Sequence, residues 1–256
     1  MSASYVGGRP VEPADAARGA MAVERVRATR SDPRLVLLEG VHALKHAVRF
    51  GAEIEVVLTP DAGELRRLLD ELAPDVALPV EVTEVSPTQW RRLVPRDLPS
   101  PVLAVAHRPA DSFGEVLASR TGRVVVLEHP RHLGNLGAAV RVAAAAGAAG
   151  LAVVGEADPW HPTAVRAAAG LQFALAVTRV DVLPGTPRPL VAIDPDGQEL
   201  GGARLDEAAV LLFGTERAGL SPGLRARADR HLAIPMRSGV SSLNLATAVG
   251  IVLYAR

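Results

Sequence analysis

Short apolar runs alternate with segments of helical periodicity along most of this chain. Runs that are rich in Val, Leu and Ala and are bounded by Gly or Pro are typical of β-strands. In the first half of the chain we predict strands at residues 35–40, 54–60, 79–85 and 101–107. Helices are predicted at residues 41–50, where Gly51 provides a stop, and at residues 64–72. These elements together predict a compact α/β unit.

The second half of the chain shows the same alternation, but its strands are more continuously apolar. We predict them at residues 123–128, 150–155, 189–194, 209–214 and 231–236. This character is typical of a parallel sheet that helices cover on both faces. The fold class is therefore α/β, and we divide the chain into a flexible tail (1–20), a smaller domain (21–107), a polar linker (108–121) and a second domain (122–256).

The composition limits the class of protein. Hydrophobic residues make up 48% of the chain and aromatic residues only 3%, so we expect cores built from Ala, Val and Leu. The absence of cysteine excludes disulfides and thiolate zinc sites, and it fits a reducing, cytoplasmic compartment. The N-terminus lacks the pattern of a signal peptide, and no run of about 18 apolar residues predicts a membrane span.

The formal net charge is zero, which weighs against a general affinity for polyanions but permits a local basic patch. Arginines gather near the start of the smaller domain, at Arg18, Arg25, Arg27, Arg30 and Arg34. A solvated helix face explains such a run, and an RNA-contacting arm is the alternative.

Polar side chains follow three of the predicted strands of the second domain. They lie in the segments NLGAAVR (135–141), FGTERAGL (213–220) and SSLN (241–244). The carboxyl ends of parallel strands meet at one edge of a sheet, and ligands bind there. The three segments therefore predict one site.

Each segment taken alone has a structural explanation. Asn135 and Asn244 can each cap the helix that follows, and Glu216 can accept hydrogen bonds from the start of a helix. Gly137 permits close approach of another backbone, and Arg141, nearly two turns after Asn135, can reach the same rim. A dinucleotide-binding loop is a rival interpretation, but the third glycine of GxGxxG is missing.

The remaining candidates are weaker. His42 and His46 are spaced i,i+4 on a predicted helix, but no carboxylate or cysteine cluster completes a metal site, so we expect none. Trp160 and His161 lie in a Pro-flanked loop; a packed loop aromatic is the favoured interpretation of Trp160, and stacking on an RNA base is the alternative.

Together and in this order, the three segments resemble the SpoU (TrmH-like) RNA ribose methyltransferases of the SPOUT superfamily. The resemblance covers residues 122–256 and rests on NLGAAVR, on LLFGTERAGLSP (211–222) and on IPMRSGVSSLNLATA (234–248). Residues 21–107 resemble, more loosely, the ribosomal-protein-like α/β domain with which many members bind RNA.

The resemblance implies a C-terminal trefoil knot, S-adenosylmethionine as the cofactor, and a homodimer whose active site uses both subunits. It implies methyl transfer to a ribose 2′-hydroxyl, and the N-terminal domain favours ribosomal RNA over transfer RNA. The functional positions that it assigns are Asn135, Arg141, Glu216, Ser242 and Asn244. The cofactor positions that it assigns are Ile193, Gly214, Ile234, Met236 and Leu243.

The sequence departs from the family pattern in three places. Glu128 stands where an aspartate is common, HLGN (132–135) replaces a DPGN-like approach, and Ala168 replaces a common serine. The resemblance places Arg141 beside the reacting hydroxyl. Since an arginine rarely gives up its proton, we expect it to bind the adjacent phosphate and stabilise developing alkoxide charge, with a role as general base as the alternative.

Three classes of function stay open from the sequence. The favoured one is an RNA 2′-O-methyltransferase, acting either in housekeeping or in antibiotic resistance. The others are a noncatalytic RNA-binding module of the same fold and a Rossmann-type dehydrogenase.

Overall fold

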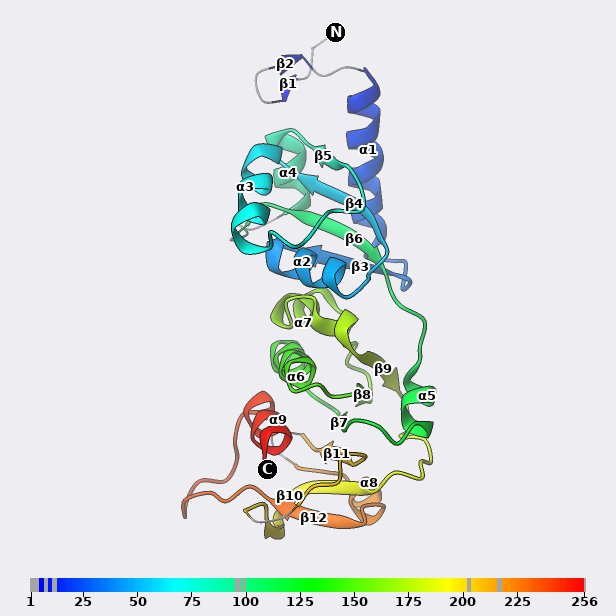
Figure 1. The fold of residues 1–256 in the computed structure, drawn as a ribbon, viewed down its shortest axis with the longest axis vertical. Helices are drawn as coiled ribbons and strands as arrows, with labels where there is room; N and C mark the ends of the chain where they lie inside the picture. Colours follow the sequence, from blue (N-terminus) through cyan, green and yellow to red (C-terminus); the bar gives the residue numbers. More distant parts are fainter. Residues whose placement is uncertain are drawn as a thin grey trace. The chain divides into compact units, whose positions relative to one another are not determined.

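The chain divides into two compact units, Met1–Pro109 and Ala110–Arg256, each of which is described here by itself. The computed structural model (Figure 1) describes residues 5–6, 9–10, 13–94, 98, 100–201, 204–215 and 218–255. In these ranges, no helix is long and apolar enough to cross a membrane.

The N-terminal unit is a four-stranded sheet with helices on both faces. The strand order is β3-β6-β4-β5, in which β6 is antiparallel to both neighbours and β4 and β5 are parallel. The strands are β3 (Leu35–Glu39), β4 (Ile54–Thr59), β5 (Val82–Glu84) and β6 (Leu103–His107). The helices are α1 (Pro13–Ala28), α2 (Val41–Arg49), α3 (Ala62–Leu72) and α4 (Pro87–Leu93). A short antiparallel pair, β1 (Tyr5–Val6) and β2 (Arg9–Pro10), precedes them.

The predicted tail of residues 1–20 is too long, because α1 already begins at Pro13. Proline is well suited to the first turn of a helix, and the alanines that follow favour the helix over a loose chain. The inner face of α1 buries Ala22, Val23 and Val26 against strands β4 and β6 and against α4. Through these residues α1 packs into the hydrophobic core of the unit.

Several of the clustered arginines are held in ion pairs within this unit. Arg25 of α1 contacts Glu55 of β4 through two hydrogen bonds, and Arg18 lies 2.6 Å from Glu81. Arg34 contacts Asp32 through two further bonds and lowers the pKa of that carboxyl to about 2. The Arg25–Glu55 pair binds α1 to the sheet, whereas the Arg34–Asp32 pair lies in the turn between α1 and β3.

The C-terminal unit is a six-stranded sheet in which all neighbours are parallel, in the order β12-β10-β11-β7-β8-β9. The strands are β7 (Val124–Glu128), β8 (Gly150–Val154), β9 (Ala176–Val180), β10 (Leu190–Glu199), β11 (Val210–Phe213) and β12 (Arg230–Ala233). The helices are α5 (Phe113–Ala118), α6 (Leu133–Ala145), α7 (Pro162–Ala167), the 3₁₀ turn η1 (Leu171–Ala174), α8 (Pro222–Ala226) and α9 (Leu245–Tyr254). In Figure 1, α6, α7 and α9 cover one face and α5 and α8 the other.

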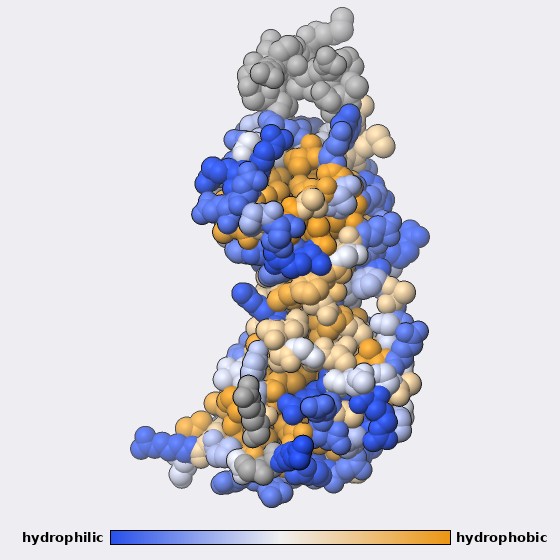
Figure 2. Space-filling view, in the orientation of Figure 1, coloured by the Kyte–Doolittle hydropathy of each residue, from blue (hydrophilic) through white to orange (hydrophobic). Residues whose placement is uncertain are grey.

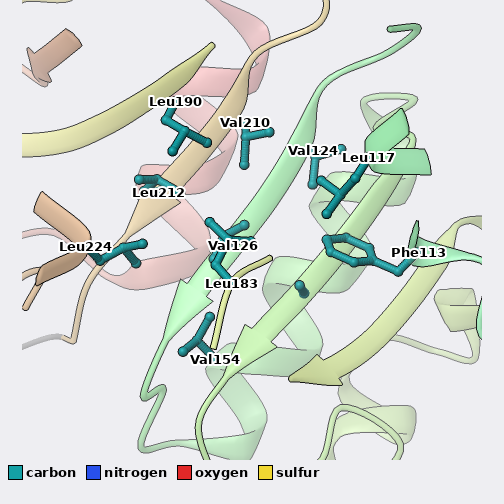
Figure 3. Close-up of a cluster of buried hydrophobic side chains, with 11 residues drawn as sticks. Phe113, Leu117, Val124, Val126, Val154, Leu183, Leu190, Val210, Leu212 and Leu224 are labelled. Carbon is teal, nitrogen blue, oxygen red and sulfur yellow. The ribbon is translucent and has the colours of Figure 1, made fainter. Parts of the chain in front are cut away.

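The predicted linker at 108–121 contains α5, which belongs to the core of the C-terminal unit. Figure 3 shows Phe113 and Leu117 of α5 packing with the side chains of β7 and β11 on the α5–α8 face. The two residues are four positions apart and therefore lie on one face of a helix. Polar residues on both sides of this short apolar stripe conceal it in the sequence.

The largest differences between the observed and the predicted sheet are at β9 and β10. Strand β9 was not predicted, because its residues AVTRV continue an apolar stretch that gives no clear period. Strand β10 extends to Glu199, beyond the predicted end at residue 194, since its pairing with β12 resumes after an irregularity between Ile193 and Gln198.

A buried arginine ties α5 to the sheet. Arg188 is 2% exposed and donates hydrogen bonds to the carbonyl groups of Ala208, Val116, Ser119 and Gly122. Burial lowers the pKa of its guanidinium, but the carbonyl oxygens provide the acceptors that a buried charge requires. Its partners come from α5, from the turn before β7 and from the turn before β11.

Candidate active site

A cavity of about 350 Å³ lies at the carboxyl ends of β11 and β12 and beside the irregular stretch of β10, the strand that neighbours both. Its walls come from residues 193–196 of β10, from the segments that follow β11 and β12, from Arg225 of α8 and from the start of α9. Among its lining residues are Ile193, Gly214, Ile234, Met236, Ser242 and Leu243. The structure thus brings all five predicted cofactor positions, together with Ser242, to one cavity.

The loop after β11 is folded tightly on itself. The backbone groups of Thr215 and Gly219 exchange two hydrogen bonds, of 3.0 and 3.1 Å. A Cβ atom on Gly214 would lie 1.9 Å from the carbonyl carbon of Gly219, so only glycine fits there. This loop therefore presents backbone to the cavity, as a site for close approach of a ligand requires.

The first and third sequence motifs meet through a pair of asparagines. The side-chain amide of Asn244 donates a 2.9 Å hydrogen bond to the side-chain oxygen of Asn135, 109 residues earlier in the chain. The side-chain oxygen of Asn244 also accepts from the backbone N–H groups of Ala246 and Thr247. Asn244 is therefore the predicted cap of α9 and, at the same time, a contact between motifs.

The prediction that Asn135 caps α6 is wrong. The helix begins at Leu133 with His132 as its N-cap, and no side chain makes the capping bond. Asn135 is the third residue of the helix, where its side chain projects from the first turn and meets Asn244.

Arg141 lies on α6, nearly two turns after Asn135, and its side chain is exposed. It does not line the cavity. Its side chain has no hydrogen-bond or ion-pair partner among the described residues. Glu216 lies outside the described residues.

Ion-paired residues that the sequence analysis missed also line the cavity. The guanidinium Nε of Arg225 lies 2.6 Å from an oxygen of Asp194, which is 8% exposed, and a second nitrogen lies 3.2 Å from Asp196. The Nδ1 atom of His231 is 3.7 Å from the same oxygen of Asp194. The sequence carried a signal for the acids, because Asp194 and Asp196 follow the apolar run at residues 190–193.

Glu128, which the sequence marked only as a departure from the family pattern, also lies at this edge of the sheet. It ends β7, is 6% exposed, and accepts hydrogen bonds from the backbone N–H of Ser221 at 2.7 Å and from its hydroxyl at 2.6 Å. Ser221 directly follows the loop that lines the cavity and is the N-cap of α8.

The remaining sequence candidates lie elsewhere. Trp160 is 6% exposed, donates to the carbonyl of Val177 and packs edge-on against Phe173, so it is a packed loop aromatic. Over the described ranges, no group of three or more His, Cys, Asp or Glu side chains is placed to hold a metal ion.

A parallel sheet that is covered on both faces and has a cavity beyond its carboxyl ends is the architecture of an α/β ligand-binding domain. The comparison with known proteins identifies the family of such domains to which the chain belongs. The sequence model of the SpoU rRNA Methylase family matches residues 122–254, which is about half of the chain, and the chain belongs to this family.

Relatives match nearly the whole chain. The chain is 32% identical over 90% of its length to "23S rRNA (uridine(2479)-2'-O)-methyltransferase" of Streptomyces viridochromogenes, and the match covers 84% of that protein. It is 30% identical over 92% of its length to "23S rRNA (adenosine(1067)-2'-O)-methyltransferase" of Streptomyces azureus, with 92% of that protein covered.

A solved structure agrees with the fold of the chain. The SpoU methyltransferase AviRb from Streptomyces viridochromogenes, in complex with AdoMet, superposes with a TM-score of 0.74 at 29% identity. The superposition covers 93% of this chain and 96% of that one. The predicted resemblance to the SpoU family is thus confirmed.

Proposed function

We propose that this chain is an S-adenosylmethionine-dependent methyltransferase that acts on a ribose 2′-hydroxyl of ribosomal RNA. The main observation behind the proposal is the cavity at β10, β11 and β12, which the second and third family motifs line. The two Streptomyces relatives are named as 23S rRNA 2′-O-methyltransferases, and the AviRb structure contains AdoMet. A ribose 2′-hydroxyl restricts the substrate to RNA.

The cavity fits this cofactor in size and chemistry. Its volume lies within the usual range of small-molecule sites, roughly 300–1,000 Å³. Ile234, Met236 and Leu243 offer apolar surface for a base, and the loop from Gly214 offers backbone groups. The carboxylate of Asp196, whose side chain is 79% exposed, suits a ligand that carries hydroxyl and cationic groups.

The bound cofactor supplies an electrophilic methyl group on a positively charged sulfur. The residues of the chain then have to align the ribose hydroxyl and stabilise the charge that develops as its proton leaves. We assign this to Arg141, which binds the neighbouring phosphate and the developing alkoxide. Asn135 and Asn244 orient each other beside it, while Ser242 and Glu216 complete the site.

A homodimer would bring Arg141 to a cofactor cavity. Arg141 does not line the cavity of its own chain, and α6, which carries it, packs against α9. The face of α9 includes the exposed apolar residues Ile251 and Tyr254, and Figure 2 shows orange side chains gathered over the α9 region. We therefore place a second copy of the chain against α6 and α9.

The finer features of the fold belong to the same proposal. We infer a trefoil knot, in which the segment from 234 to 244 passes through a loop. Strand β12 lies at the edge of the sheet, yet α9 returns to pack on α6, which follows the central strand β7. The N-terminal unit is proposed to bind ribosomal RNA in the cytoplasm, since the Streptomyces relatives match it as well.

Single-turnover methylation of ribosomal RNA tests the role of Arg141. We expect Arg141→Ala to lower the rate by about 10²–10³-fold, the usual loss when one donor to a developing negative charge is removed. Arg141→Lys should keep part of the rate, because it keeps a positive charge. RNA affinity is measured separately. A near-normal rate in the alanine variant would contradict the role assigned to Arg141.

A further inference from the structure

Glu128 is a buried carboxylate at the end of strand β7. It is 6% exposed, and within the described residues both of its hydrogen bonds come from Ser221. A buried charge is costly unless donors satisfy it, and bonds to an ionised group are stronger than neutral ones. The two bonds, of 2.6 and 2.7 Å, therefore make a firm tie between β7 and Ser221.

Ser221 stands where the cavity loop ends and α8 begins. Its hydroxyl accepts the backbone N–H of Leu224 at 3.2 Å, which caps α8, while it donates its own proton to Glu128. The preceding residues 214, 215 and 218–220 line the cavity. The start of this loop is fixed by β11, and its end is fixed by Glu128.

Helix α8 is also held from the other side of β11. Arg225 of α8 pairs with Asp194 of β10, whereas Glu128 belongs to β7. In the sheet, β11 lies between β10 and β7. The loop after β11 and the helix that follows it are thus tied to the strands on both sides.

We propose that Glu128 is a positioning residue for cofactor binding. Acting through Ser221, it holds the cavity-lining residues 218–220 in the form that binds S-adenosylmethionine. The inference rests on the proposed function, because it takes the cavity to be the cofactor site. It predicts that loss of the Glu128–Ser221 contact weakens cofactor binding, although neither residue lines the cavity.

Calorimetric titration of the full chain with S-adenosylmethionine tests this. Glu128→Gln keeps the size of the side chain but removes its charge, and we expect the dissociation constant to rise on the order of tenfold. Ser221→Ala removes the hydroxyl from the same contact and should act in the same direction. The double variant should lose less than the two single effects combined, because both substitutions break one interaction.

The matched control is Thr178→Val at the far edge of the same sheet. Thr178 is buried and donates a 2.9 Å hydrogen bond to the carboxylate of Asp111, so its loss also removes a buried bond to a carboxylate. We expect it to lower the melting temperature and leave the dissociation constant unchanged. Hydrogen exchange without cofactor adds a local readout: the Gly219 amide should exchange faster in Glu128→Gln, while the amides of β11 should not.

The outcomes separate the inference from the proposed function. If the unmodified chain does not bind S-adenosylmethionine, the proposed function fails. If it binds, and both Glu128→Gln and Ser221→Ala bind within twofold of it with unchanged exchange at Gly219, the positioning role is overturned. If Thr178→Val weakens binding as much as Glu128→Gln does for the same fall in melting temperature, the positioning role is overturned as well.

Discussion

At Gly137 the packing of two helices depends on a single missing side chain. A Cβ atom there would lie 2.2 Å from the carbonyl oxygen of Ala164 and 2.7 Å from the Cβ of Ala167, both on α7. A backbone oxygen cannot rotate away as a long side chain can. The glycine of the first motif therefore sets the distance between α6 and α7, in addition to its place beside Asn135.

We expect Gly137→Ala to reduce the free energy of unfolding by about 1–3 kcal/mol, because α7 has to move outward. Gly134→Ala is the control in the same helix, since nothing lies within 4 Å of the Cβ position there. That variant should be neutral or slightly stabilising, by roughly 0.4–1 kcal/mol. Urea denaturation measures both, and equal effects of the two substitutions would contradict the packing argument.

At the scale of the element, α9 depends on Asn244 for two separate tasks. The side-chain oxygen caps the helix, and the side-chain nitrogen donates to Asn135. The tasks can be separated because aspartate has the oxygen but lacks the donor.

Asn244→Asp should keep the free energy of unfolding close to that of the unmodified chain, since an acid is a good N-cap and favours the helix N-terminus. Asn244→Ala should lose about 1 kcal/mol. Both variants should lose methyl-transfer activity if the contact with Asn135 organises the site. Thermal denaturation and single-turnover assays measure the two properties, and an active aspartate variant would show that Asn244 serves the helix alone.

The sequence was most informative for elements whose character is local. The apolar runs of β7, β8 and β11 are buried on both faces, so their residues alone identified them. The short helices α5 and α8 and strand β9 were missed, because segments of five or six residues have little intrinsic preference and are fixed by tertiary packing.

The same distinction holds for the site. Gly214, Ile234 and Leu243 lie in motifs that can be read along the chain, and they do line one cavity. The contact between Glu128 and Ser221 joins residues 93 positions apart, and the one between Arg225 and Asp194 depends on the order of strands in the sheet. Neither the sheet order nor the pairing of buried charges has a local signature in the sequence.

At the scale of the whole molecule, the proposed dimer explains why an exposed apolar surface lies next to a motif residue. Ile251 and Tyr254 of α9 are 39% and 61% exposed, and Arg141 is exposed on α6, which packs against α9. Apolar residues exposed together near a functional group are typical of an interaction surface. A symmetric dimer would bury the same surface of both copies.

Ile251→Arg places a charge in the proposed interface, and we expect it to convert the dimer to a monomer in sedimentation velocity. Val182→Arg is the control, because Val182 is also an apolar residue of this unit, 71% exposed, in the segment after the edge strand β9. It should remain dimeric and active. The Ile251→Arg monomer should lose methyl transfer, because Arg141 then has no partner cavity to reach. Its thermal stability should fall no further than dissociation of the dimer requires. If the unmodified chain sediments as a monomer at micromolar concentration and is nevertheless active, Arg141 must act on its own cavity, and the shared active site is excluded.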